Sequence, residues 1–343
     1  MTKKSILLIA SSVAALFLAG FFIHRCYWRT GDSPSDRERL LSMMPGDSTI
    51  VAYVDLAQFR SSPFLSTLFR FVPKAAPDTE YAEFLKMTGF NYETDLDRVA
   101  LSINRQSQPF TAFAVADGRF DRKKIEAFVS RYGSLKTAEG NTLFAVPLNG
   151  SSRKAYLTFL NSGRVAWAND PSYFFQQKHR GSSADWRDHF LRVAGTPIFA
   201  VLRQDSDGDI QLTAQAPGGF QSPQLAALLN QLQWVSISGK PEGDFLRVVV
   251  DGECAAETTQ RQLKDVLGGL LVLAQAGLND PKTRRRLDPA LRSAYLELLQ
   301  SADIQSTDLG KAKSIRVVFD LTQKLLEAAP DTSYVTHPAQ STH

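Results

Sequence analysis

An uninterrupted apolar run, SILLIASSVAALFLAGFFI, covers residues 5–23 and contains no charged residue. At about 1.5 Å per residue, a helix of this length reaches about 28 Å, close to the hydrocarbon thickness of a bilayer. Tyr27 and Trp28 follow, and both residue types prefer the membrane–water interface. The pattern predicts a transmembrane helix over residues 5–23, a cytoplasmic tail over 1–4 and a juxtamembrane linker over 24–43.

A cleaved signal peptide fits this run less well than a permanent anchor. The run is longer than the apolar core of a typical signal peptide, and no A-x-A-like cleavage site follows it. Phe17 stands where such a site needs a small residue, and a lipobox would need small residues in place of His24 and Arg25 before Cys26. Cleavage and a buried soluble helix remain the two alternatives.

The charges beside the run indicate its orientation. Lys3 and Lys4 favour a cytoplasmic N terminus, whereas Arg25 and Arg29 oppose this orientation weakly. We therefore expect the body of the protein to lie outside the cytoplasm, attached to the lipid bilayer through the N-terminal helix.

Beyond the linker, the spacing of apolar residues predicts strands and helices in one order that occurs twice. The order is a strand, a helix that starts at Ser-Pro, a hairpin that ends in Asp-Gly, a helix, a strand and a last helix. A first unit over 44–180 would use the segments 49–56, 61–72, 98–104, 109–118 and 163–177. A second unit over 190–329 would use the corresponding segments 197–205, 221–232, 233–239, 244–252 and 314–328.

The clearest sign of repetition is FAVADG at 113–118 and VVVDG at 248–252. In each, the glycine is expected to break the strand by adopting a positive φ, while the aspartate hydrogen-bonds the local backbone. Matching order over several elements favours divergent duplication over chance resemblance between β-rich segments. The units also differ, because the first has a short helix ending at Gly89 and a meander over 141–168, and the second has a helix over 288–300.

The predicted fold is therefore α+β, with one N-terminal transmembrane helix followed by two related units of mostly antiparallel sheet with helices on one face. The two sheets would lie side by side and leave a groove between the units. The helix after each Asp-Gly has an apolar face, made of Ile125, Phe128, Val129 and Tyr132 in the first unit and of Leu263, Val266, Leu267, Leu270, Leu271 and Ala274 in the second. The tail over 330–343 is predicted to be disordered.

The composition agrees with a folded protein and gives little sign of a nucleic-acid partner. Of the 343 residues, 43% are hydrophobic and 22% are charged, and the net charge of +4 arises from interspersed opposite charges. The one basic run, Lys282 with Arg284 to Arg286, is predicted to be a solvated connector between helices, with a patch for an anionic partner as the alternative. Cys26 and Cys254 are too few for a disulfide framework.

The stretch MMPGDSTIVAYVDLAQFRSSPFL, with TGFNYETDLDRVAL after it, resembles a group of uncharacterised bacterial proteins that are membrane-anchored and carry an extracytoplasmic domain of unknown function. Their hallmark is a Met/Leu-Pro-x-Asp opening before the first strand, which is residues 44–47 here. The resemblance is best over residues 43–104. It implies a single-pass protein of the bacterial inner membrane, and it implies no reaction and no catalytic residues.

Two segments could at first sight bind a metal ion. His179 and His189 could approach a metal with Asp185 or Asp188, but their spacing matches no standard site, so we interpret this segment as an exposed linker between the units. The sequence DSDGDI at 205–210 lacks the glycine and glutamate positions of an EF-hand and is predicted to be a hairpin turn.

Motifs for covalent or nucleotide chemistry are missing from the sequence. It contains no G-x-S-x-G elbow, no Walker loop and no G-x-G-x-x-G. Asp55, Asp117 and Asp251 each end a predicted strand, where aspartate usually serves as a turn or cap residue, and catalytic carboxylates would have to converge on one cleft. We therefore assign no catalytic, cofactor-binding or metal-binding residue and expect no cofactor.

These features favour a non-enzymatic, membrane-tethered binding or scaffolding protein, with another envelope protein as a candidate partner. The alternative is a hydrolase-like enzyme of the cell envelope whose site assembles from residues without a motif. A cleft with converging polar groups and shifted pKa values would favour the enzyme. A broad apolar surface patch would instead favour partner binding.

Overall fold

The structure is a computed structural model that describes residues 34–64, 79–107, 109–138, 141–147, 154–175, 184–204, 223–309 and 312–328. Five of the predicted features fall outside these residues: the cytoplasmic tail over 1–4, the transmembrane helix over 5–23, the candidate ligand His179, the hairpin turn over 205–210 and the disordered tail over 330–343. Within the described part of the chain, none of the helices has the length and apolar character that crossing a bilayer requires.

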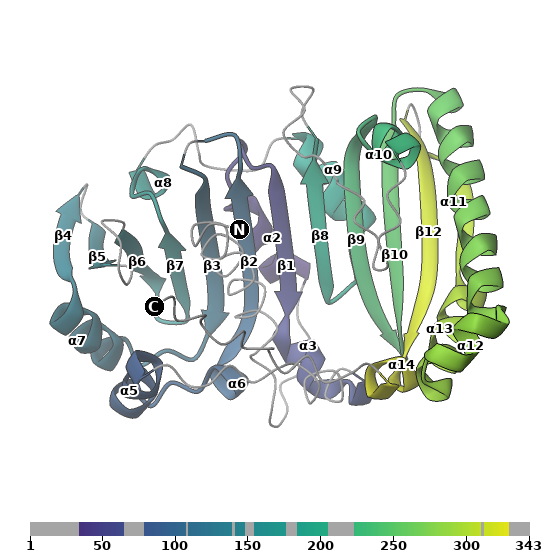
Figure 1. The fold of residues 1–343 in the computed structure, drawn as a ribbon. Coiled ribbons are helices and arrows are strands. Elements are labelled where there is room, and N and C mark those ends of the chain that lie inside the picture. Colours follow the sequence, from purple (N-terminus) through teal and green to yellow (C-terminus); the bar gives the residue numbers. More distant parts are fainter. Residues whose placement is uncertain are drawn as a thin grey trace, which may run out of the picture.

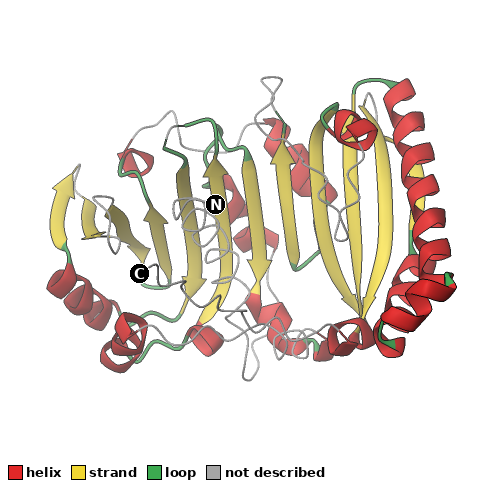
Figure 2. Ribbon diagram, viewed as in Figure 1, coloured by secondary structure: helices red, strands yellow, loops and turns green. Residues whose placement is uncertain are grey.

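The strands of the described residues form one sheet of twelve strands, and every neighbouring pair is antiparallel (Figures 1 and 2). The fold is α+β with a large antiparallel sheet and helices, as the sequence predicted. The strands are β1 (Ile50–Asp55), β2 (Leu96–Asn104), β3 (Thr111–Gly118), β4 (Ser134–Ala138), β5 (Asn141–Pro147), β6 (Lys154–Asn161), β7 (Arg164–Ala168), β8 (Ile198–Arg203), β9 (Leu232–Glu242), β10 (Phe245–Cys254), β11 (Asp303–Leu309) and β12 (Ala312–Thr322).

The order of strands is the same when each half of the sheet is read outward from its centre. At the centre β1 pairs with β8, and Ala52 lies opposite Ala200. From β1 the order is β2, β3, β7 and β6, and from β8 it is β9, β10, β12 and β11, while β5 and β4 extend the first half only. The predicted hairpins are confirmed as β2–β3 and β9–β10. The expectation of two sheets is wrong, because the β1–β8 pairing joins all the strands into one.

Helices pack on both faces of the sheet, so the expectation of helices on a single face is also wrong. Side chains alternate along a strand, and the two faces of β1 therefore meet different helices. Tyr53 belongs to a core with residues of α2, α8 and α9, whereas Val54 packs with Phe59 of α3 on the opposite face. The helices are α2 (Pro34–Ser42), α3 (Leu56–Ser61), α5 (Thr79–Thr88), α6 (Tyr92–Asp95), α7 (Arg122–Tyr132), α8 (Ser172–Phe175), α9 (Ala184–Arg192), α10 (Pro223–Leu229), α11 (Glu257–Asn279), α12 (Pro281–Arg286), α13 (Pro289–Ser301) and α14 (Gln323–Ala328).

Two segments expected to be polar linkers are helices that bury apolar side chains. Part of the predicted juxtamembrane linker forms α2, and Leu40 and Met44 are fully buried at and just after its end. The described part of the segment expected to be an exposed linker between the units lies in α9, whose Trp186 is fully buried. Trp186, His189 and Phe190 of α9, with Val193 just after its end, follow the i, i+3, i+4, i+7 spacing of an amphipathic helix. Leu40 and Met44 are likewise four residues apart. In both segments this helical spacing of apolar residues explains the helix, and the charged residues beside them obscure the pattern.

The two Asp-Gly sequences do not act as predicted. Among the described glycines, positive φ values occur at Gly89, Gly195 and Gly243, and neither Gly118 nor Gly252 is one of them. Gly118 is the last residue of β3, but β10 continues through Gly252 to Cys254. The predicted helix stop at Gly89 is confirmed, with φ of 67° directly after α5.

The helices that follow the hairpins are confirmed, and both Ser-Pro segments are helical at their proline. Ile125, Phe128 and Val129 of α7 pack in one cluster, and Leu263 of α11 is fully buried. α10 occupies part of the second predicted Ser-Pro helix. In the first unit α3 precedes the Ser-Pro pair and Ser62 is its C-cap. Pro63 and Phe64 are helical again, as the Ser-Pro start predicts, while residues 65–72 lie outside the described ranges.

Three consecutive helices lie beside the outer strands of the second half (Figure 1). α13 confirms the helix predicted over 288–300, and the basic run lies in α12 between α11 and α13. Lys282 and Arg284 to Arg286 are exposed. The prediction of a solvated connector is therefore confirmed, and the connector is itself a short helix.

Candidate functional site

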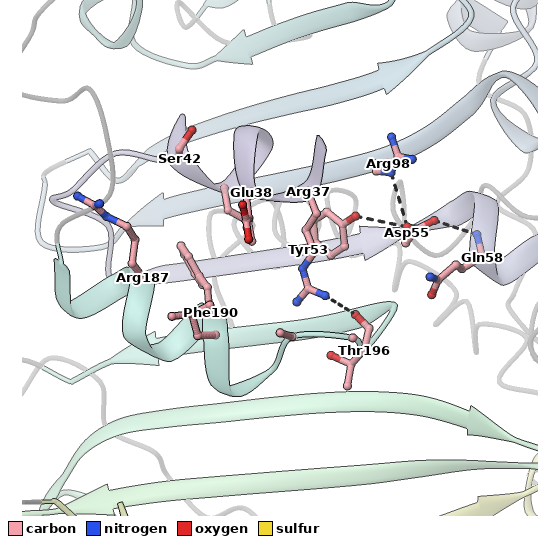
Figure 3. A pocket seen from close by; sticks show the side chains of 14 residues that line it. Arg37, Glu38, Ser42, Tyr53, Asp55, Gln58, Arg98, Arg187, Phe190 and Thr196 are labelled. Carbon is pink, nitrogen blue, oxygen red and sulfur yellow. Dashed lines mark hydrogen bonds and ion pairs between the residues drawn. The ribbon is translucent and has the colours of Figure 1, made fainter. Parts of the chain in front are cut away.

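A cavity of about 500 Å³ opens between α2 and α9 where the two halves of the sheet meet (Figure 3). Its floor includes Tyr53 and Asp55 of β1 and Arg98 of β2. Its walls include Leu41 of α2 and Phe190 of α9. The sequence predicted a groove between two units, and the cavity occupies that position.

The helices that form the walls correspond to each other in sequence and in their place before a central strand. The sequence DRERLL of α2 aligns with WRDHFL of α9, and the two helices lead into β1 and β8 respectively. This alignment matches Arg37 with Arg187 and Leu41 with Leu191, and all four residues line the cavity. The cavity is therefore built from two corresponding helices, one from each half of the sheet.

Arg37 ties the two walls together. Its Nη2 donates a hydrogen bond of 2.9 Å to the carbonyl oxygen of Val193, and Nη1 donates one of 3.4 Å to that of Thr196. The guanidinium also lies over two aromatic rings, 5.2 Å from the centroid of Tyr53 and 4.8 Å from that of Phe199. Burial lowers the pKa of Arg37, although Arg37 remains protonated at any pH at which the protein is folded. Carbonyl oxygens and ring faces thus hold this charge at the C-terminal end of α9, where a cation is favoured.

Tyr53 and Asp55 lie two residues apart on β1, so both face the cavity side of the sheet. Asp55 is the N-cap of α3 and accepts a hydrogen bond of 2.8 Å from the backbone N–H of Gln58. The Tyr53 hydroxyl donates a longer hydrogen bond, of 3.4 Å, to the same carboxylate. Burial raises the pKa of Asp55, and burial together with the nearby charge of Asp55 raises the pKa of Tyr53. Tyr53 is therefore a neutral donor at the cavity floor.

Asp55 begins a row of alternating charges that crosses four neighbouring strands. Asp55, Arg98, Asp117 and Arg164 occupy opposed positions on β1, β2, β3 and β7. Arg98 lies 3.6 Å from Asp55 and 3.8 Å from Asp117, and burial lowers its pKa. Arg164 makes two hydrogen bonds to Asp117, of 2.6 and 2.9 Å, which raise the pKa of Arg164. Each carboxylate of the row has at least one guanidinium beside it, so the row is a self-neutralised part of the fold.

The second half has a matching pair on the equivalent strands. Asp251 of β10 lies opposite Arg316 of β12 and accepts hydrogen bonds of 2.8 and 3.0 Å from it. Asp117 and Asp251 are the aspartates of the two Asp-Gly sequences, so the repeated sequence places the same ion pair on both halves. Of the three strand-end aspartates that the sequence singled out, Asp55 alone lines the cavity.

His189 packs on the far side of α9 from the cavity, against β9 and β10. Its ring stacks on Trp234 with 3.9 Å between centroids, and Nδ1 lies 2.7 Å from the carbonyl oxygen of Asp185. Nε2 lies 2.9 Å from a Glu253 oxygen without hydrogen-bond geometry, and Arg192 contacts the same oxygen. Burial lowers the pKa of His189, and the hydrogen bond to the Asp185 carbonyl oxygen opposes this shift only in part. His189 is thus a packing residue, and no group of three metal-ligating side chains occurs among the described residues.

The Met44-Pro45-Gly46-Asp47 sequence has a structural role before β1. Met44 is buried in the core, and Asp47 accepts a hydrogen bond of 3.2 Å from the side chain of Asn104 at the end of β2. The Ser48 hydroxyl contacts the Pro45 carbonyl oxygen, and it lies 2.6 Å from the Ser102 hydroxyl. This turn joins α2 to β1 and β2 and so fixes one wall of the cavity above its floor.

Sequence reasoning missed Arg37, Tyr53 and Arg98 as residues of a site. The position of Tyr53 was readable, because i and i+2 in a strand share a face and Asp55 had already been considered. A second signal of the site was an arginine followed by an acidic residue, which occurs at Arg37 and again at Arg187. Their convergence depends on β1 pairing with β8, which no local pattern reveals.

The fold and site define an α+β protein with a single large antiparallel sheet and a cavity between two corresponding helices. No protein-family model and no curated protein matches the sequence. Among solved structures, crystal form III of TP0453 has a TM-score of 0.39 at 8% identity, over 84% of this chain and 98% of that one. Crystal form IV of TP0453 has a TM-score of 0.40 at 8% identity, over 83% and 95% of the two chains. A likeness of this strength carries no argument about function.

Proposed function

We propose that the chain is a single-pass, membrane-anchored protein of the bacterial cell envelope whose folded region lies outside the cytoplasm and has a non-catalytic binding role. The anchor would be the uncharged segment over 5–23. The folded region begins with α2 at Pro34, so only residues 24–33 would separate it from the anchor. Ten extended residues span at most about 36 Å, which would keep the cavity near the bilayer surface.

The observation that supports a binding role is the cavity and the state of its polar groups. Its volume of about 500 Å³ lies within the range of small-molecule sites. Asp55 caps α3 and Arg98 lies between two carboxylates, so these floor residues also maintain the fold. Residues held in this way give a rigid floor that suits recognition, since a binding site works best on groups that do not move.

We also propose that the two halves are related units that arose by duplication. Three features support this: the shared strand order, the correspondence of α2 with α9, and the Asp–Arg pairs on β3–β7 and β10–β12. In this proposal the cavity lies between two copies of the same helix, and its lining differs at the two walls because the copies have diverged.

A cell-envelope hydrolase is the second candidate function, and one observation favours it. Tyr53 and Asp55 converge on the cavity floor with pKa values that burial raises, and such shifts are common in catalytic acids. The variant Asp55→Asn separates the two functions, because asparagine keeps the capping oxygen but cannot transfer a proton. An enzyme that uses Asp55 would lose turnover of any substrate found in a hydrolase screen, whereas a binding protein would keep its ligand.

Membrane anchoring can be tested with the full-length chain carrying a C-terminal tag. We expect the tag in the membrane fraction after a high-salt wash, and we expect protease added to spheroplasts to remove it. The double variant Val13→Arg, Leu16→Arg should release the protein, because each arginine at a helix centre costs about 2.5–3.5 kcal/mol on insertion. Thr30→Arg is the matched control and should stay in the membrane. A wild-type chain that is soluble with its N terminus intact, or a tag protected in spheroplasts, contradicts the proposal.

A further inference from the structure

The walls of the cavity divide into apolar and charged parts. Leu41 and Phe190 are both buried side chains of the cavity lining. Leu191 also lines the cavity, but its side chain is 65% exposed. Apolar surface that remains accessible at the side of a cavity is favourable for the body of a ligand, because its contact with the ligand removes water. Tyr53 adds a ring face and a neutral hydroxyl at the floor (Figure 3).

The charged part of the lining is richer in guanidinium groups than in carboxylates. Arg37, Arg98 and Arg187 line the cavity together with two acids, Glu38 and Asp55. Arg98 already lies between Asp55 and Asp117 in the charge row. The charges of that row cancel one another. Of the lining residues outside the row, Arg37 and Arg187 carry positive charge and Glu38 alone carries negative charge, so positive charge is in excess.

Arg37 is the buried member of this excess. Among the described residues, its hydrogen bonds go to two carbonyl oxygens, and no carboxylate lies within the 4.0 Å of an ion pair. Arg187, its counterpart on α9, is exposed at the other end of the cavity. Glu38 and Asp55 line the same cavity but do not contact Arg37 as ion-pair partners. A guanidinium in a partly apolar site without such a contact is a favourable partner for an acidic group, because the pair forms charge-assisted hydrogen bonds.

We propose that the cavity binds an amphipathic organic anion, whose acidic group pairs with Arg37 and lies in the field of Arg187 while its apolar body rests on Leu41, Phe190 and Leu191. The proposal rests on the binding role given above and adds the class of ligand. It requires both parts of the lining: an uncharged ligand of the same shape gains the apolar contacts alone, and a small inorganic anion gains the charge contacts alone.

The test is a fluorescence titration of the full-length protein in nanodiscs of zwitterionic lipid. The probe is 8-anilinonaphthalene-1-sulfonate, and N-phenyl-1-naphthylamine has the same ring system without the sulfonate. After subtraction of empty nanodiscs, we expect saturable one-to-one binding of the sulfonate and at least tenfold weaker binding of the neutral amine. Ala194→Trp, which places a large ring in the cavity mouth, should abolish the saturable signal.

Charge variants locate the acidic group. Arg187→Gln should weaken binding of the sulfonate by only about twofold, because this exposed charge acts through a field that solvent screens, and it should leave binding of the amine unchanged. Arg37→Gln should weaken binding of the sulfonate further, and circular dichroism must show that this variant is folded. Arg284→Gln on α12 removes the same charge far from the cavity and should bind as wild type.

The outcomes separate the ligand class from the binding role. Equal binding of the sulfonate and the amine, both lost in Ala194→Trp, would overturn the anionic class and leave a binding cavity. Sulfonate binding that survives Ala194→Trp would overturn the site. Absence of saturable binding by either probe would overturn both the ligand class and the cavity as the binding site, whatever the fractionation result.

Discussion

Asp117 of β3 and Arg164 of β7 lie directly opposite each other and share two hydrogen bonds, of 2.6 Å between Oδ1 and Nε and 2.9 Å between Oδ2 and Nη2. Asp251 and Arg316 repeat this geometry on β10 and β12, with 2.8 and 3.0 Å. Both pairs are bidentate, which is the strongest geometry of an Arg–carboxylate pair. They differ in exposure, because the side chain of Arg164 is 15% exposed and that of Arg316 is 36% exposed.

The difference in exposure leads to the first prediction, on double-mutant cycles of the two pairs. The coupling free energy of Asp117→Asn with Arg164→Gln should be about 2 kcal/mol, as for hydrogen bonds between charged groups away from solvent. The cycle of Asp251→Asn with Arg316→Gln should give about 0.5–1 kcal/mol, because solvent screens the more exposed pair. Urea unfolding of the full-length protein measures both. A second-half coupling larger than the first would contradict the argument.

The glycines that follow the two aspartates should respond differently to alanine. A Cβ at position 118 would clash with the backbone oxygen of Asp95, which cannot move without disturbing the start of β2. A Cβ at position 252 would meet side chains alone, those of Leu232 at 3.0 Å and of Ile315 at 3.4 Å. We expect Gly118→Ala to lower the free energy of unfolding by about 1–3 kcal/mol, and Gly252→Ala to change it by under about 1 kcal/mol. Each variant is the control for the other, and equal losses would show that the repeated sequence has one structural role.

Local elements of the fold were readable from the sequence, whereas their assembly was not. The β2–β3 and β9–β10 hairpins followed from short polar loops between apolar runs, and Gly89 marked the end of a helix because it can adopt a positive φ. The placement of helices on both faces was missed, since alternation along a strand shows which residues share a face but not which helix covers them. A groove between the units was expected, but the residues that line the cavity were missed, because β1 and β8 are separated by more than a hundred residues.

The row of charges shows the same division. The pairing of Arg98 with Asp117 could have been derived from the predicted hairpin, whose register places them opposite each other. The pairing of Asp55 with Arg98 could not, because β1 and β2 are joined by a long segment that includes α3 and α5. The sequence therefore showed Asp55 as a cap, which is confirmed, but gave no sign of its place beside the cavity.

The burial of one side of α9 leads to a prediction about a buried and an exposed side chain of this helix. Trp186 is fully buried and lies edge-on to Trp234, with 5.0 Å between ring centroids. Trp186→Ala should lower the free energy of unfolding by about 3–5 kcal/mol, because it removes a large ring from a packed core. Leu191→Ala on the exposed side of the helix is the control and should change it by no more than about 0.5 kcal/mol. Similar small effects of both variants would restore the exposed-linker interpretation.

Asp55 should make the protein less stable as the pH rises through the acidic range. Burial raises its pKa above the ordinary value of 3.8, so between these two values the folded state binds more protons than the unfolded state. Under this condition the free energy of unfolding falls as the pH rises, and the stability present below about pH 3.8 is lost through the raised pKa.

Asparagine cannot titrate but keeps the oxygen that accepts from the Gln58 N–H. The free energy of unfolding of wild type minus that of Asp55→Asn should therefore decline as the pH rises above about 4, as measured by urea titrations at each pH. Other titrating groups cancel in this difference, because both proteins carry them. A difference that increases with pH would show that Arg98 stabilises the Asp55 carboxylate more than burial destabilises it.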